Sequence, residues 1–329
     1  MKRIAPLIVA FVSVLTFACA PKKPVNVDEL VKKAEFSDGE IVLPEVCLDS
    51  DDAEKANEEL KKLYESWQQW RSEGINISSS YATALRNGIL SLRVIEAFND
   101  GIVDDSRYYT YMFNIESGRA ISYGEFLELF GITQDHAEFY VMLAYAKAAF
   151  ELGWDDESFL PYQTLRGSMS QTKSSFADSA ESEVLSYFFD ETGTPYVSVM
   201  FITPEGAQER AVPLFPSDDA STLLLGDWLL DAGDAVYRLS FEAGGRMTAR
   251  VTDAEGLEIQ SFSASYKARP EGTELVLEVT GEMGSFEARL SGTFVYQFIV
   301  LPGDGVPLAP GEYTYEEPER SITDYYEIY

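Results

Sequence analysis

The second half of the chain alternates apolar with polar residues in a series of short runs that begins near Leu223. The alternating apolar positions are Leu239 and Phe241; Met247, Ala249 and Val251; Leu275, Leu277 and Val279; Phe286, Ala288 and Leu290; and Phe294, Tyr296, Phe298 and Val300. Turn-forming residues separate these runs, at 243–245, 253–256, 270–272 and 283–284. Successive side chains of a strand point to opposite faces, so a period of two indicates strands rather than helices. The pattern predicts an antiparallel meander that closes as a barrel or a sandwich.

A Gly-x-Trp sequence, Gly226-Asp227-Trp228, stands at the start of this meander. Together with the alternating runs, it resembles the start of lipocalin-like barrels. In that family the tryptophan closes one end of the barrel, so the resemblance implies a structural role for Gly226 and Trp228. The predicted lipocalin-like β domain, residues 223–311, is short, and its interior could be filled by its own side chains. The acidic, tyrosine-rich segment 312–329 is interpreted as a tail or as one edge strand.

Residues 41–216 mix helical and strand patterns and predict an α+β domain. Helices are indicated where apolar residues recur every three or four positions, and a hairpin is indicated where Asn-Gly joins two β-rich runs. The predicted elements are a helix over 53–71, strands over 80–85, 89–98 and 108–115, a short helix that begins after Ser122, a helix from Thr133 to Leu152, and a hairpin of 187–189 with 196–202. Trp67 and Trp70 share the apolar face of the first helix and are interpreted as core residues rather than as a stacking platform. Residues 217–222 are the expected linker to the β domain.

Two segments of the α+β region carry a resemblance to a bacterial extracytoplasmic domain family. Asn87–Leu92 reads Asn-Gly-Ile-Leu-Ser-Leu, and Phe113–Ser122 reads Phe-Asn-Ile-Glu-Ser-Gly-Arg-Ala-Ile-Ser. With the long helix and the hairpin that follow, they resemble the domain of RsiV-type anti-sigma factors, which sense lysozyme, and the non-catalytic part of PdaC-type peptidoglycan deacetylases. The resemblance implies a binding module over about residues 40–216. The family's Gly-Gly-Ala-His-type loop is replaced here by residues 99–105, and no deacetylase domain follows, so enzyme activity is not implied.

Residues 1–18 have the layout of a secretory signal peptide, because Lys2 and Arg3 precede an almost wholly apolar run over 4–17. The following Ala18-Cys19 resembles the lipobox of bacterial lipoproteins, in which the cysteine receives acyl chains such as palmitate. The resemblance predicts lipidation of Cys19 and attachment of the protein to a membrane on the extracytoplasmic side. If the cell has two membranes, the residue after the cysteine, Ala20, resembles the pattern that sorts lipoproteins to the outer membrane. Cleavage by ordinary signal peptidase after Ala20, or an uncleaved anchor, are the alternatives. Residues 19–40 are the expected tether.

Reactive side chains are scarce in this sequence. The chain has one histidine and two cysteines, which argues against a disulfide framework, a catalytic triad and most zinc sites. His136 is interpreted as a surface or capping residue, and Cys47 as a small buried hydrophobe. The acidic stretches 49–52 and 100–105 lack the register of a calcium loop and are interpreted as solvated loops. No catalytic residue, metal or cofactor is predicted, and the chain is not expected to be an enzyme.

The balance of charge indicates the kind of partner. The sequence holds 25 Lys and Arg against 55 Asp and Glu, for a net charge of −30. Such a surface repels the phosphates of nucleic acid and attracts basic proteins. The leading hypothesis is therefore a lipid-anchored, non-enzymatic binding or sensing module of the cell envelope, for a cationic extracellular protein such as lysozyme or for a cell-wall component. The alternatives are a lipocalin-like carrier of a small apolar ligand and a cell-wall glycan hydrolase that uses paired carboxylates.

Overall fold

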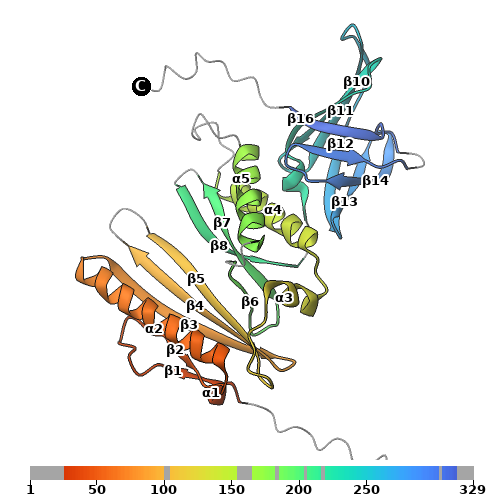
Figure 1. Ribbon diagram of the computed structural model, residues 1–329. Helices are drawn as coiled ribbons and strands as arrows, with labels where there is room; N and C mark the ends of the chain where they lie inside the picture. The colour runs from red at the N-terminus through yellow and green to blue at the C-terminus, as the bar shows by residue number, and fades with distance from the viewer. Residues whose placement is uncertain are drawn as a thin grey trace, which may run out of the picture.

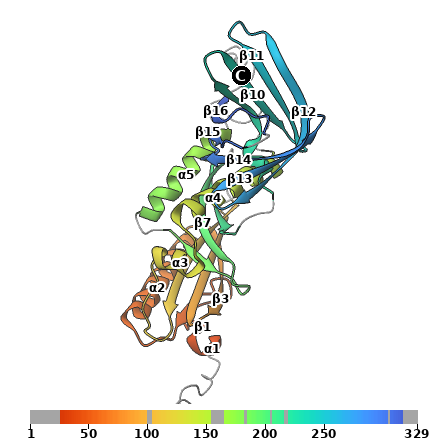
Figure 2. The same cartoon turned by 90° about the vertical axis from the view of Figure 1, so that its right-hand side faces the viewer.

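The computed structural model describes residues 26–99, 104–153, 165–181, 185–203, 206–215, 219–303 and 306–316. These residues form three parts that follow one another along an elongated molecule (Figures 1 and 2). An N-terminal lobe spans 26–119, a middle part spans 120–215, and a β-barrel spans 219–316. The lobe and the middle part are α+β and the barrel is all-antiparallel, so the predicted fold class is confirmed.

The N-terminal lobe is a helix packed on one face of an antiparallel sheet. Its elements are α1 (Val27–Leu30), β1 (Val31–Lys33), β2 (Pro44–Val46), α2 (Asp51–Ser72), β3 (Asn76–Arg86), β4 (Ile89–Asn99) and β5 (Asp104–Asn114). The predicted apolar face of α2 buries Leu60 and Trp67 completely against Ile77 and Val94 of the sheet. Asn87 and the glycine after it both have positive φ, at 50° and 76°, which is the backbone of the two-residue hairpin turn that Asn-Gly predicts.

Asp38 joins the loop between β1 and β2 to the end of α2. Its Oδ1 accepts the backbone N–H groups of Ile41 at 2.7 Å and Glu40 at 2.8 Å. Its Oδ2 accepts bonds from Gln68 and Arg71, each at 2.8 Å. These donors, with the Ile41 N–H first, lower the pKa of Asp38 to about 2.

We expect Asp38→Asn to weaken the N-terminal lobe by about 1 kcal/mol at neutral pH, because the carboxylate is about a third exposed and solvent screens its contacts. The folded-state pKa lies below the unfolded value of 3.8. The carboxylate therefore stabilises the fold above about pH 4 and loses this contribution as the pH falls towards 2. Urea unfolding of both proteins between pH 2 and 7 measures the effect. The difference in unfolding free energy should shrink at acidic pH, and a difference that is the same at pH 2 and pH 7 would contradict this role.

The middle part places two helices against a second antiparallel sheet. Its elements are α3 (Tyr123–Phe130), α4 (Gln134–Glu151), α5 (Leu165–Glu181), β6 (Tyr187–Phe189), β7 (Pro195–Thr203) and β8 (Gly206–Pro213). Ser122 and Glu125 form a capping box at the start of the predicted α3, and the side chain of Thr133 caps α4. Two elements, α5 and β8, were not predicted. The serine-rich α5 has no clear apolar period of its own and packs on α4 and β7, and β8 is a largely polar strand at the sheet edge.

The third part is a closed antiparallel barrel that contains eight strands in the described part of the chain. After a short turn, η1 (Ser221–Leu224), its strands are β9 (Gly226–Asp231), β10 (Ala235–Glu242), β11 (Arg246–Asp253), β12 (Glu258–Glu271), β13 (Glu274–Gly281), β14 (Gly284–Gly292), β15 (Gln297–Val300) and β16 (Gly311–Glu316). Neighbouring strands pair in sequence order, and β16 pairs with β9 to close the ring. This lipocalin-like barrel has the topology that the alternating runs predict.

Three predicted boundaries are wrong where the structure describes them. Residues 312–316, interpreted as a tail or one edge strand, form most of β16, which pairs with both β15 and β9, so it closes the barrel and leaves no edge. Tyr313 is fully buried there, and residues 317–329 lie outside the described part. The expected tether 19–40 is folded from Val27 onward, since Val31 is buried and pairs with Val46; Cys19 and the rest of 19–25 lie outside. Within the expected linker 217–222, Ala220 is fully buried and its N–H bonds the carbonyl of Ala268 at 2.8 Å.

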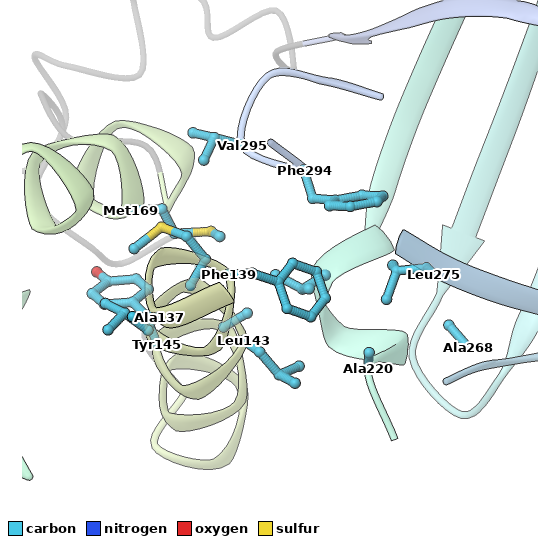
Figure 3. Packing of buried hydrophobic residues seen from close by; sticks show 14 of the residues in the cluster. Ala137, Phe139, Leu143, Tyr145, Met169, Ala220, Ala268, Leu275, Phe294 and Val295 are labelled. Carbon is cyan, nitrogen blue, oxygen red and sulfur yellow. The ribbon is translucent and has the colours of Figure 1, made fainter. Parts of the chain in front are cut away.

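One apolar core continues from the middle part into the barrel. Phe139 of α4 contacts the ring of Phe294 in the turn between β14 and β15, with ring centroids 6.1 Å apart. Figure 3 shows Phe139 between α4 and the barrel residues Ala220, Leu275 and Phe294. The two parts predicted as separate domains therefore share one continuous cluster of buried apolar residues.

Candidate functional site

The two residues predicted at the start of the barrel lie in its core. Trp228 of β9 is fully buried, and its indole N–H donates to the carbonyl of Leu224 at 2.6 Å. Its ring contacts Phe298 and Tyr315 at centroid distances of 4.7 and 5.2 Å. Gly226 has a φ of 109°, and a Cβ atom there would lie 2.5 Å from the Tyr315 ring. Glycine is thus required at 226 by both backbone conformation and close approach.

An arginine from outside the barrel completes this cluster. Arg166 of α5 is buried, and its guanidinium lies 4.9 Å from the Trp228 ring centroid and 4.8 Å from that of Tyr315. It donates to the carbonyls of Leu223, Leu225 and Phe294 at 3.0, 2.7 and 2.6 Å. Burial lowers the pKa of Arg166 to about 10, so the group stays charged at neutral pH. Because its partners belong to the protein itself, Arg166 joins α5 to the barrel rather than forming a ligand site.

Buried side chains pack in the described interior of the barrel. They come from all eight strands and include Phe241, Leu277, Leu290 and Tyr313. A cavity between β10–β12 and residues 307–309 measures about 20 Å³. That volume is close to the space that one water molecule needs. A lipophilic ligand would need a far larger cavity than this one.

A wider hollow lies in the N-terminal lobe beside the first turns of α2, and we call it the acidic groove. Its volume is about 570 Å³, and it is lined by Phe36, Pro44, Glu45, Leu48, Asp49, Ser50, Asp51, Glu54, Asn57, Glu58 and Lys61. Five of these residues are acidic and one is basic. Phe36, Pro44 and Leu48 supply apolar surface, so the groove offers both charge and hydrophobic contact.

Local hydrogen bonds fix the walls of the acidic groove. Ser50 caps α2 by accepting the N–H of Ala53 at 3.2 Å. Asn57 bonds both the N–H and the carbonyl of Val46, at 2.8 and 2.9 Å, and so holds β2 against α2. The groove is therefore bordered by backbone that packing and hydrogen bonds hold in place, rather than by side chains alone.

Most of the negative charge in the groove is not neutralised. Glu45 pairs with Lys32 at 3.0 Å. Asp49, Asp51, Glu54 and Glu58 form no ion pair with any residue in the described ranges. The sequence predicted 49–52 to be a solvated acidic loop, which is wrong for Asp51 and Asp52, because they form the first turn of α2. Asp49, Ser50 and Asp51 line this groove. The groove itself was not predicted, since acids separated by three or four positions on a helix form a site only once β2 and Phe36 are placed beside them.

A second hollow, of about 500 Å³, lies between Phe150 near the end of α4 and the turn between β10 and β11. Its lining holds three acidic residues and two basic ones, Lys267 and Arg269, and Arg269 pairs with Glu278 at 3.1 Å. Glu242 likewise pairs with Arg246 at 2.9 Å. This hollow therefore offers no uncompensated charge comparable to that of the acidic groove.

His136 and Cys47 lie in different parts of the molecule, the middle part and the N-terminal lobe. His136 is in the first turn of α4, where its Nδ1 lies 2.8 Å from Thr133 Oγ1, in keeping with a capping position. Cys47 is exposed, which corrects the prediction of a buried thiol. It follows the buried Val46 of β2, and the alternation of an extended chain turns its side chain to solvent. Among the described residues, no group of three or more His, Cys, Asp or Glu side chains is arranged to hold a metal ion.

No helix in the described ranges is both long and apolar enough to cross a membrane. Comparison of the chain with protein-family models, curated proteins and solved structures finds no match.

Proposed function

We propose that this protein is an exported, lipid-anchored binding module that captures a cationic protein in the acidic groove. The observation that carries the proposal is a set of four carboxylates, Asp49, Asp51, Glu54 and Glu58, that form no ion pair within the described part of the chain and lie beside an apolar wall in one hollow of about 570 Å³. Unpaired charge held by a fixed backbone is ready to bind, because little reorganisation is needed on association. The net charge of −30 adds a long-range field that raises the rate of encounter with a basic partner.

The position of the groove suits a chain that is anchored through Cys19. The first described element, α1, lies at the end of the molecule opposite the barrel (Figures 1 and 2). Seven residue steps separate Cys19 from Asn26, and an extended chain of that length spans at most about 25 Å. An anchor at Cys19 would hold the acidic groove close to the membrane surface, where cationic proteins gather on anionic headgroups.

Capture of a cationic lysozyme tests the proposal, and the resemblance to the lysozyme-sensing domain makes this enzyme the first probe. We expect the purified protein without its leader to bind lysozyme at physiological salt, and more tightly at low salt. Glu54→Gln combined with Glu58→Gln should weaken binding about tenfold at physiological salt, as measured by titration calorimetry.

A matched control separates the groove from net charge. Asp178→Asn combined with Glu181→Gln removes the same two charges from exposed positions on α5, and this variant should bind like the wild type. No binding of lysozyme at either salt would contradict capture of this cationic protein. An equal loss in both double variants would show that the overall field, and not the groove, attracts the partner.

A further inference from the structure

One strand of the barrel runs past its neighbour and leaves part of its edge open. β12 pairs with β13 only from Ala264 onward, because β13 turns at Glu282 and Met283 into β14. Of the preceding residues, Glu258 and 260–263 pair with β11 on their other side, and the register shifts at Ile259, which has no partner in β11. This segment lies at the far end of the barrel, since the turn after β12 at the opposite end lies beside His136 of α4. We call residues 258–263 the open edge.

The backbone of the open edge is available to a further strand. In an antiparallel ladder, the N–H and C=O of one residue point to the same side, and successive residues alternate. Tyr266 donates its N–H towards β11, to the carbonyl of Gly245 at 2.7 Å. The register with β11 is regular from Gln260 to Ser265. Ser261 is an odd number of residues from Tyr266, so its N–H and C=O point away from β11, to the side where β13 has ended.

Apolar side chains are exposed along the open edge and beside it. Ile259 is 62% exposed, and two neighbours in the adjoining turns, Leu257 and Met283, are 68% and 51% exposed. Natural edge strands are shielded by charged residues, above all lysine, by proline, by β-bulges or by a covering segment. Here Glu258 and the bulge at Ile259 lie at one end of the segment and leave 260–263 regular. The open edge contains neither lysine nor proline, and among the described residues no strand pairs with it on this side. Exposed apolar groups beside unpaired main-chain groups are the features of a surface that binds an extended peptide by strand addition.

The negative charge around the open edge indicates which kind of peptide would bind there. The two far-end hairpin segments, 253–263 and 281–288, hold five acidic residues, Asp253, Glu255, Glu258, Glu282 and Glu287, and no basic one. Arg250 of β11, opposite Ser261, pairs with Glu258 at 3.2 Å, so the local charge stays negative through the other four acids. A second copy of this chain would bring the same acids against them and would be repelled. We propose that the open edge binds an extended, basic segment of another protein, in which lysine or arginine alternates with apolar residues. This surface is at the opposite end of the molecule from the acidic groove and does not depend on the proposed function.

A pair of synthetic peptides tests the proposal without knowledge of the natural partner. The first alternates lysine and valine, and the second has the same composition with its lysines and valines in separate blocks. The protein should bind the alternating peptide at least about tenfold more tightly at physiological salt, because only this peptide can present charge on one face and apolar groups on the other while pairing its backbone. A peptide that alternates glutamate and valine should not bind. Equal affinity for both lysine peptides would overturn the proposal.

A variant and a direct readout locate the binding. Ser261→Pro removes an N–H from the open side of the strand, where proline is tolerated, and should abolish the preference for the alternating peptide. Glu54→Gln with Glu58→Gln in the acidic groove should leave that preference unchanged. In the wild type, hydrogen exchange of the Ser261 amide should slow when the alternating peptide is added. This readout holds even if the proline variant fails to fold, and exchange that is unaffected by the peptide would also overturn the proposal.

Discussion

Replacing Arg166 by alanine is expected to lower the free energy of unfolding of the barrel and middle part by about 3–5 kcal/mol, since three carbonyls and two rings lose their buried partner. The carbonyls of Leu223, Leu225 and Phe294 all accept from this one guanidinium. No water can replace it without a polar cavity, and the surrounding rings of Trp228 and Tyr315 are apolar on the side that faces it. Arg166→Lys should recover only part of the loss, because a single ammonium cannot reproduce the planar fork that reaches three acceptors.

Arg289→Ala provides the matched control for this prediction. Arg289 pairs with Glu271 and Glu274 at 3.1 and 3.2 Å, but it is half-exposed on the barrel surface. Its removal should cost less than about 1 kcal/mol, because exposed ion pairs contribute little. Chemical unfolding followed by tryptophan fluorescence measures both variants. A similar small loss for the two would show that Arg166 does not hold α5 to the barrel, and separate unfolding transitions in Arg166→Ala would show that it couples them.

The barrel could be predicted because its information is local. Alternation within each run identifies a strand, and the short turns between runs leave neighbouring pairing as the simplest topology. The last strand shows the limit of this reasoning. Glu312 to Glu316 also alternates, with Tyr313 buried and its neighbours more exposed, but the acids and the position near the end of the chain favoured a tail. This segment becomes a strand because it closes the barrel by pairing with β9. Closure depends on all the strands of the sheet, so a single run of residues does not reveal it.

Arg166 could not have been identified from the sequence. It stands in a serine-rich segment without a clear period, and its carbonyl partners are 57, 59 and 128 positions away. The same difficulty applies to the acidic groove. The four carboxylates that lack an ion pair among the described residues have no distinguishing local pattern within the 55 acids of the sequence, because their significance depends on which lysines and arginines the fold places nearby. Sequence periodicity therefore predicts secondary structure and buried residues. Charged sites depend instead on which residues, distant in the sequence, the fold brings close together.

The two tryptophans of α2 should respond very differently to the same substitution. Trp67 is fully buried and its ring lies 5.8 Å from that of Tyr109, whereas Trp70, one turn later, is only partly buried at the edge of the same cluster. Trp67→Ala should destabilise the N-terminal lobe by about 3–5 kcal/mol, because the cavity left between helix and sheet cannot close without moving β4. Trp70→Ala should cost about 1–2 kcal/mol, in proportion to the smaller area that it buries. Urea unfolding followed by circular dichroism measures both. Equal losses would mean that α2 packs on its sheet with a different face. The acidic groove lies on the same helix, so other side chains would then line it.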